Sequence, residues 1–308
     1  MSDPWTVLRL LTWTTDYLKS HSADSPRLDA EVLLAHARGC ERITLYTAFD
    51  EVVSEEVRAR FRDLVKRRAE GTPVAYLVGK REFYSLSFRV TPDVLIPRPE
   101  TEFVVLAALD ALKGSGFRVQ GSDSEEIRNP KSKIQNPLVA DVGTGSGAIA
   151  VAIAKHAPNC RVVATDISAA ALSIAKENAK SHHVSDRIKF LEGDLLAPVP
   201  AEPRFAVIVS NPPYIGENEI GTLAASVRDH EPRHALIAGP TGTEVIERLL
   251  PQAAERLLPG GWLILEISPL VASRVVELIA ADRRYEPATI TKDLAGLARV
   301  VKARRTHK

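Results

Sequence analysis

The spacing of hydrophobic residues changes along the chain, and the first change marks a predicted domain boundary. Between residues 4 and 72, apolar side chains recur every three or four positions, as in the segment from Val7 to Leu18. This is the period of amphipathic helices. Ser54, followed by two glutamates, predicts the start of another helix, and Gly71-Thr-Pro73 predicts its end. The sequence therefore predicts a small helical domain over residues 1–72.

Short strand-like runs follow this region. Residues 74–78, 82–84 and 86–90 are apolar or alternating, and Gly79 and Ser85 separate them. Such runs predict a β-hairpin. Three prolines then stiffen the chain. We therefore interpret residues 73–99 as a hairpin and a proline-rich linker between two domains.

The rest of the chain, residues 100–308, is expected to form one larger domain with an insertion near its start. An apolar helix is expected over residues 102–112. Residues 113–137 are polar, rich in Gly, Ser, Asn and Pro, and lack periodicity, so they predict a flexible surface loop.

From residue 138 onward, apolar strands alternate with helices. Such alternation predicts an α/β fold with a doubly wound, mostly parallel sheet. A ligand of this fold binds beyond the carboxyl ends of the strands. The predicted strands are 138–142, 161–165, 187–191, 205–210 and 261–267, and the predicted helices are 147–156, 168–181, 243–258 and 271–281.

A glycine-rich segment lies between the first of these strands and the helix after it. Its sequence is Asp141-Val-Gly143-Thr144-Gly145-Ser146-Gly147. Glycine lets the backbone turn sharply and lets a ligand approach without meeting a β-carbon. Asp166 ends the next strand, where a carboxylate can accept hydrogen bonds from ribose hydroxyls. These features predict a nucleoside-binding site. A dinucleotide remains possible at this point, because Ala148 completes the G-x-G-x-x-A pattern.

A second motif, Asn211-Pro212-Pro213-Tyr214, follows the strand 205–210, which should lie beside the glycine-loop strand. Two adjacent prolines make a rigid backbone, and Pro212 has no N–H donor. The Asn211 oxygen and nearby carbonyls can accept hydrogen bonds from a substrate –NH2 group. Tyr214 can lay its ring against a planar amide or base. The motif predicts a site that aligns a weakly nucleophilic nitrogen for transfer of an activated group.

Composition and charge narrow the class of protein. The chain has 308 residues, 26% of them charged, and a formal net charge of +1. Bulk nucleic-acid binding would favour a larger basic excess, so no stable nucleic-acid binding is expected. The two cysteines and the absence of metal-ligand spacing predict neither a disulfide framework nor a metal site. The N-terminus has no signal-peptide pattern and no segment is apolar enough to span a membrane, so a cytoplasmic protein is expected.

The glycine loop resembles that of class I S-adenosylmethionine-dependent methyltransferases. The whole chain resembles the HemK-type protein-glutamine methyltransferases, which methylate the glutamine of a Gly-Gly-Gln loop in peptide chain release factors. Besides the two motifs above, the resemblance rests on the runs RLDAEVLL (27–34), PVAYLVG (73–79), Phe83-Tyr84, LIPRPETE (95–102), Glu231-Pro232, Ala235-Leu236 and KDLAG (292–296).

This resemblance implies roles for individual residues. Gly143, Thr144, Gly145, Ser146 and Gly147 would hold S-adenosylmethionine. Asp166 would bind its ribose, and Asp194 with Leu195 would lie on its adenine side. Asn211 would touch both cofactor and substrate, and Pro212, Pro213 and Tyr214 would shape the glutamine pocket, with Asn211, Pro212 and Tyr214 as the catalytic group.

The resemblance also implies that the helical domain docks a release factor as protein substrate, and we expect a monomer. The resemblance places Arg98 and Glu100 near the pocket. They either act as site residues or form a structural ion pair with each other. The chain departs from the family in its long 113–137 insertion, in Glu266-Ile-Ser-Pro269 where Glu-Ile-Gly is usual, and in lacking Asp before Arg299.

Other functions stay open from the sequence. An adenine amino-methyltransferase of DNA or RNA would use the same asparagine–proline chemistry. A glutamine methyltransferase of a ribosomal protein, a non-catalytic adaptor and a nicotinamide oxidoreductase are further alternatives.

Overall fold

The computed structural model describes residues 4–21, 23–114 and 136–307. Contacts divide the chain into two units. Unit 1 comprises residues 1–80 and 223–230, and unit 2 comprises residues 81–222 and 231–308. Most of the insertion predicted at 113–137 lies outside the described residues, so the prediction for it stays a prediction.

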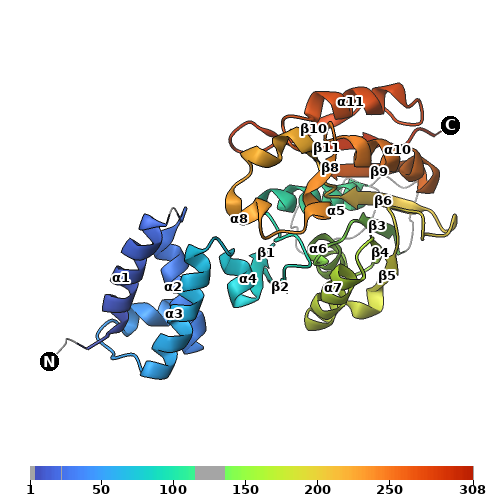
Figure 1. Ribbon diagram of the computed structural model, residues 1–308. Coiled ribbons are helices and arrows are strands. Elements are labelled where there is room, and N and C mark those ends of the chain that lie inside the picture. The colour runs from blue at the N-terminus through green and yellow to red at the C-terminus, as the bar shows by residue number, and fades with distance from the viewer. Residues whose placement is uncertain (1–3, 22, 115–135, 308) are drawn as a thin grey trace. The chain divides into compact units, whose positions relative to one another are not determined.

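Unit 1 is built from helices, as its sequence period predicts (Figure 1). Ser54 caps the third helix, with its hydroxyl accepting a hydrogen bond from the Val57 N–H, and Gly39 ends the second in the left-handed conformation. Leucine, valine and alanine side chains from these helices form one buried core. The elements are α1 (Val7–Ser20), α2 (Pro26–Arg38), η1 (Arg42–Thr47), α3 (Glu55–Ala69), α4 (Val74–Val78) and α8 (Ala225–Arg228).

The prediction of a strand at residues 74–78 is wrong, because these residues form helix α4. Val74, Leu77 and Val78 have the i, i+3, i+4 spacing of a helix face, and Leu77 is buried in the core of unit 1. Gly79 adopts φ 72° and ends the helix. Packing against the helical core therefore outweighs the strand preference of the two valines.

The predicted hairpin is present just after α4. Strands β1 (Lys80–Phe83) and β2 (Leu86–Arg89) pair, and the turn between them is Tyr84-Ser85, both with φ near +55°. The Tyr84 N–H donates to Glu102 Oε1 at 2.9 Å. Positive φ at both turn residues is the geometry that matches the twist of paired strands.

Unit 2 contains a seven-stranded sheet in the order β10-β11-β9-β6-β3-β4-β5 (Figure 1). Strands β5, β4, β3, β6 and β9 are parallel, as predicted, and β3 lies between β4 and β6. The strands are β3 (Leu138–Val142), β4 (Arg161–Asp166), β5 (Ile188–Glu192), β6 (Phe205–Ser210), β9 (Leu257–Glu266), β10 (Thr289–Lys292) and β11 (Ala298–Arg304).

The two C-terminal strands are absent from the predicted elements. β11 pairs antiparallel with both β9 and β10, so the sheet is mixed at this edge. Val300, Val301 and Ala303 are buried in β11, whereas all of β10 is exposed or half-buried. An edge strand of this kind carries little hydrophobic signal in its sequence.

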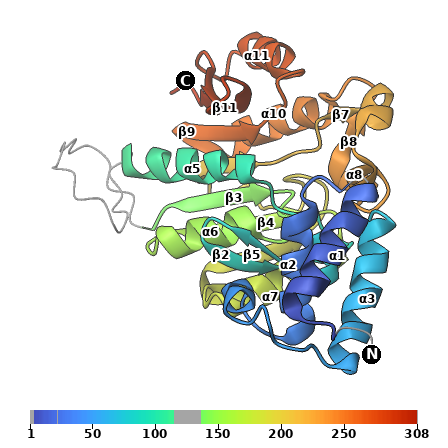
Figure 2. The same ribbon diagram turned by 90° about the vertical axis from the view of Figure 1, so that its left-hand side faces the viewer.

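Helices cover both faces of the sheet (Figure 2). Residues of α5, α6 and α7 share one buried core with alternate strand residues such as Val207 and Val209. Residues of α10 and α11 share the other with Ile208. The helices of unit 2 are η2 (Pro99–Thr101), α5 (Glu102–Gly114), α6 (Ala148–His156), α7 (Ala169–Ser181), η3 (Ser185–Arg187), η4 (Glu217–Thr222), α9 (Arg233–Leu236), α10 (Glu244–Arg256) and α11 (Ala272–Ala281), and a small sheet pairs β7 (Ile215–Gly216) with β8 (Ile237–Gly239).

No helix within the described part of the chain is both long and apolar enough to cross a membrane.

Candidate active site

A pocket of about 340 Å³ opens at the carboxyl ends of the parallel strands of unit 2. This is the edge of the sheet at which doubly wound folds bind ligands. Of the twelve cofactor, substrate and catalytic residues expected from the sequence, nine line this pocket: Gly143, Thr144, Gly145, Ser146, Asp166, Asp194, Leu195, Asn211 and Pro213. Three others, Gly147, Pro212 and Tyr214, do not line it.

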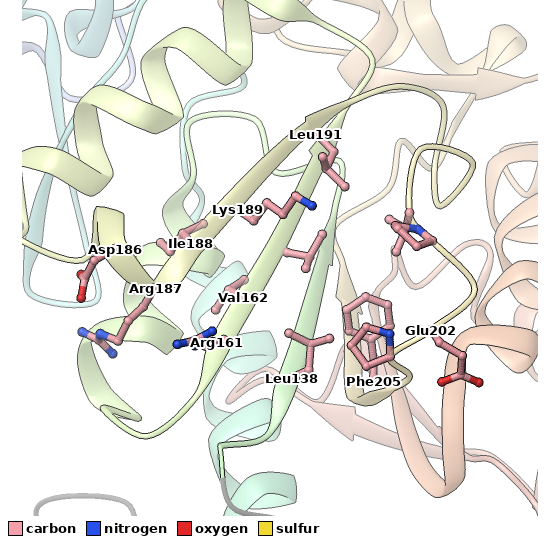
Figure 3. Close-up of a pocket in the computed structure, with 14 residues that line it drawn as sticks. Leu138, Arg161, Val162, Asp186, Arg187, Ile188, Lys189, Leu191, Glu202 and Phe205 are labelled. Carbon is pink, nitrogen blue, oxygen red and sulfur yellow. The ribbon is translucent and has the colours of Figure 1, made fainter.

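A second pocket, of about 290 Å³, lies at the opposite edge of the same sheet (Figure 3). It is lined by the first residues of four strands, Leu138, Arg161, Ile188 and Phe205. None of the site residues expected from the sequence lines it. The carboxyl-end pocket is therefore the candidate active site.

The glycine loop after β3 forms the floor of the candidate site. Thr165 O accepts hydrogen bonds from the N–H groups of Gly143 and Thr144, both at 2.9 Å. Gly143 and Gly145 have φ of +71° and +55°, and a β-carbon added to either would meet no atom within 4 Å. The left-handed backbone favours glycine, and the open space above it leaves room for a ligand.

Gly147 is glycine for a different reason. A β-carbon at this position would come within 3.1 Å of the Ala175 side chain in α7. Its φ is +80°, and it stands directly before α6. Close packing of the loop on α7 thus explains this glycine, whereas Gly143 and Gly145 face the pocket.

Asp141 lies beneath the loop and holds its shape. Its Oδ2 accepts hydrogen bonds from Thr144 Oγ1 at 2.7 Å and from the Ala150 N–H at 3.0 Å. The residue is 0% exposed, and its Oδ1 has no partner within the described residues. Burial raises the pKa of this carboxyl to about 7, against the opposing effect of the two hydrogen bonds.

Asp166 lies at the end of β4 and faces the same pocket. Its two carboxylate oxygens accept hydrogen bonds from the N–H groups of Gly145 at 2.8 Å and Ser168 at 2.9 Å. These bonds fix the carboxylate, and each oxygen keeps a further lone pair for a ligand hydroxyl. This is the geometry expected of a ribose-binding acid.

The end of the pocket beyond β5 carries an ion pair. The carboxylate of Asp194 bonds to the guanidinium of Arg248, which comes from α10. Both residues and Leu195 line the pocket. Arg248 is not among the site residues expected from the sequence. The helical pattern of α10 does not show that one of its residues contacts the loop after β5.

The Asn211 loop is fixed to the glycine-loop strand. Ser210 Oγ donates to Val142 O at 2.7 Å, so the last residues of β6 and β3 are joined. Asn211 Nδ2 donates to Thr101 Oγ1 at 3.2 Å. The Asn211 oxygen has no hydrogen-bond donor among the described residues and is thus available as an acceptor.

The two prolines and Tyr214 occupy different positions around this asparagine. Pro213 lines the pocket and Pro212 is buried. The Tyr214 hydroxyl donates to Glu266 Oε1 at 3.2 Å. Tyr214 therefore supports the loop from behind through its hydroxyl.

The proline-rich segment before α5 forms another wall, which the sequence indicates only in part. Leu95, Pro97 and Thr101 line the pocket. Arg98 forms an ion pair of 2.5 Å with the buried carboxylate of Glu231, and Glu231 also accepts the Ile96 N–H at 3.3 Å. Arg98 thus has a structural partner, 133 residues away.

Glu100 has a different neighbour from the one considered in the sequence. It lies 3.8 Å from the guanidinium of Arg299, so Arg98 and Glu100 do not pair with each other. These partners could not be found from periodicity, because each joins segments far apart in the chain.

The shape, hydrogen-bond acceptors and charge of the pocket fit S-adenosylmethionine. The loop leaves open space above two glycines, and Asp166 keeps acceptor capacity for ribose hydroxyls. Asp93, Asp166 and Asp194 outnumber Arg248, the arginine of the lining that pairs with Asp194, and this excess of carboxylates suits a cationic sulfonium. Within the described residues, no group of three His, Cys, Asp or Glu side chains is placed to hold a metal ion.

The fold and this site define a methyltransferase domain. A family model for the methyltransferase small domain matches residues 129–277, and a model for the PrmC N-terminal domain matches residues 9–79. Two solved structures share the fold: the hMettl16 catalytic domain in complex with a 3′UTR hairpin (TM-score 0.54, 17% identity, covering 80% of this chain and 82% of that one), and T. thermophilus RsmC, a 16S rRNA methyltransferase in complex with AdoMet and guanosine (TM-score 0.50, 19% identity, 73% and 49%).

Curated relatives match along almost the whole chain. A release factor glutamine methyltransferase of Rhodopirellula baltica is 51% identical over 97% of this chain and 96% of its own length. Those of Koribacter versatilis and Geobacter sulfurreducens are each 38% identical, over 94% and 97% of this chain and 95% and 97% of their own lengths. The chain belongs to the release factor glutamine methyltransferase family.

The two open glycines predict a specific effect on cofactor binding. Gly143→Ala places a methyl group in the pocket, so it is expected to weaken S-adenosylmethionine binding about tenfold or more in calorimetric titration. Gly39→Ala is the matched control, because Gly39 has φ +68°, equally open surroundings and no place in the pocket. Each variant should lose about 1–2 kcal/mol of stability from its strained backbone. Equal cofactor affinity in the two variants would contradict this assignment.

Asp141 predicts a pH dependence of stability. Its pKa is near 3.8 in the unfolded chain and about 7 when folded, so its contribution to stability is full below about pH 4 and is lost as the pH rises toward 7. Asp141→Asn keeps the acceptor oxygen and does not titrate. Urea unfolding of the ligand-free protein from about pH 5 to 8 should show a smaller fall in the variant. Parallel curves for the two proteins would refute the raised pKa.

Proposed function

We propose that this protein transfers a methyl group from S-adenosylmethionine to the side-chain amide nitrogen of the glutamine in a Gly-Gly-Gln loop of peptide chain release factors. The observation that carries the proposal is the Asn211 oxygen, a fixed and unused acceptor at the edge of the cofactor pocket. Membership of the release factor glutamine methyltransferase family supports the substrate. The expected reaction needs no metal.

The residues of the site would promote the reaction by aligning the glutamine amide nitrogen with the methyl group of the cofactor. An amide nitrogen is a weak nucleophile because its lone pair is delocalised into the carbonyl. S-adenosylmethionine, when bound, supplies a methyl group already activated on a cationic sulfur. Asn211 would accept one N–H of the glutamine amide, and main-chain carbonyls of the rigid Pro212-Pro213 segment would accept the other. The transfer exchanges one N–H hydrogen for a methyl group and releases a proton.

Holding both N–H groups has two consequences. It points the nitrogen at the sulfonium methyl, and it draws electron density onto the nitrogen. Positioning of this kind accounts for a large part of the rate of bimolecular transfers in enzymes. Asp166 and the glycine loop would hold the donor on the other side of the same gap.

The helical unit is proposed to dock the protein substrate. Several large apolar side chains are exposed on this unit, and where such side chains adjoin they mark protein-contact surfaces. Residues 223–230, which follow the Asn211 loop in the chain, belong to this unit. Its large exposed apolar residues are Leu8, Trp13, Leu28, Ile43, Tyr46 and Val52.

Mass spectrometry of a release factor after incubation with enzyme and cofactor tests the proposal. The Gly-Gly-Gln peptide should gain one methyl group, and a release factor with this Gln replaced by Ala should gain none. Asn211→Ala should lower kcat about 100-fold, the order expected for loss of a fixed hydrogen-bonding group at a reacting centre. Asn218→Ala, at an exposed asparagine, serves as the control.

Three outcomes would overturn the proposal. Methylation of RNA or DNA without methylation of a release factor would indicate an adenine amino-methyltransferase. Methylation of a ribosomal protein, without methylation of a release factor, would assign the enzyme a different substrate. Full activity of the Asn211→Ala variant would remove the amide-holding mechanism.

A further inference from the structure

A buried carboxyl group, that of Glu266, lies at the base of the Asn211 loop. Glu266 ends β9 and is 2% exposed. It does not line the cofactor pocket. Its neighbour Leu265 pairs in register with Ser210, the residue before Asn211, so the sheet brings Glu266 to the base of the Asn211 loop.

Two hydroxyl groups lie beside this carboxylate. The Tyr214 hydroxyl donates to Oε1 at 3.2 Å. The Thr101 hydroxyl is close enough to the carboxyl group to lower its pKa. The second oxygen, Oε2, has no partner within the described residues. The pKa of the Tyr214 hydroxyl is raised, chiefly by burial and then by Glu266, so the hydroxyl keeps its proton and remains a donor.

The direction of these hydrogen bonds determines the orientation of the Asn211 amide. Above about pH 7 the Glu266 carboxyl is ionised and can only accept, so the Tyr214 hydrogen points toward it and the Thr101 hydrogen is attracted to it. Thr101 Oγ1 then offers its lone pairs to Asn211, whose Nδ2 donates to it at 3.2 Å. Because the nitrogen end of the amide faces Thr101, the oxygen end is the one left for a substrate.

We propose that Glu266 is a positioning residue that, through Thr101, fixes which end of the Asn211 amide faces the substrate and, through the Tyr214 hydroxyl, holds the loop in place. The inference rests on the proposed function. Without the carboxylate, the Thr101 hydroxyl could donate to the Asn211 oxygen, and the amide would turn its N–H groups toward a substrate that also presents N–H groups. Asparagine amides have nearly the same shape in both orientations, so a polar neighbour must choose between them.

The surroundings of Glu266 support this role over that of a stabilising ion pair. Arg299, the cation beside it, pairs with Asp293 at 2.8 Å and lies 3.8 Å from Glu100. Burial raises the pKa of Glu266 to about 7, with Glu100 adding to the effect, while the two hydroxyls and Arg299 oppose it. A buried carboxyl with one unsatisfied oxygen costs stability. This loss of stability is explained if the carboxylate fixes the hydrogen bonds of the site.

Steady-state kinetics with a release factor as substrate tests the inference. Thr101→Val is nearly isosteric and removes the hydroxyl, so kcat should fall about tenfold, while the KM for the release factor and the affinity for S-adenosylmethionine change less than about twofold. Thr101→Ser restores the hydroxyl and should recover kcat to within about threefold of the wild type. Glu266→Met has a similar length and no acceptor oxygen, so it should lower kcat as Thr101→Val does.

Thr14→Val is the matched control, because Thr14 is a buried threonine of unit 1 whose hydroxyl has no partner within the described residues. It should leave all three quantities unchanged. If Thr101→Val misfolded and lost cofactor binding, the kcat of Glu266→Met would test the inference by itself. Wild-type kcat in Glu266→Met, with methylation intact in the wild type, would overturn this inference only. A wild-type protein that methylates no release factor would overturn the proposed function and this inference together.

Discussion

The pairing of β3 with β6 is the constraint on which the site depends. Val142 and Ser210 are partners in register, and the Ser210 hydroxyl donates to Val142 O. The glycine loop leaves one of these strands and the Asn211 loop leaves the other. Because parallel strands end at the same edge, a donor held by the first loop and an amide held by the second must meet there. A shift of one strand by one residue would turn all of its side chains to the opposite face of the sheet.

Much of this arrangement could be predicted from the sequence because it is local. A glycine-rich loop between an apolar strand and a helix, and Asn211-Pro-Pro-Tyr after another apolar strand, carry their chemistry in short runs of residues. The parallel order of five strands follows from their alternation with helices. The family resemblance read from these motifs is confirmed by relatives that match along the chain.

The parts that could not be predicted depend on tertiary contacts. Residues 74–78 form a helix because the core of unit 1 takes up their apolar face. The antiparallel edge strand β10 has too little hydrophobic signal to show in the sequence. Arg98 pairs with Glu231, 133 residues away, and Glu266 lies at the base of the Asn211 loop only because β9 lies beside β6. No spacing rule links such residues.

Two buried carboxyl groups, one behind each loop, reflect the same physical compromise. Asp141 supports the glycine loop and Glu266 supports the Asn211 loop, and burial raises the pKa of each to about 7. Each leaves one oxygen without a partner within the described residues. Apolar side chains at these positions would cost less to bury, but they could not direct hydroxyl and N–H groups. The site therefore gives up stability for a fixed hydrogen-bond pattern.

The central claim is that the Asn211 oxygen holds the substrate amide beside the donor. A crystal structure of the protein with S-adenosylhomocysteine and a release factor tests it most directly. The account predicts that the glutamine nitrogen lies about 3 Å from Asn211 Oδ1, the normal length of such a hydrogen bond, with Asn211 Nδ2 still on Thr101. A carboxamide bound elsewhere, or an Asn211 oxygen turned toward Thr101 in the complex, would contradict it.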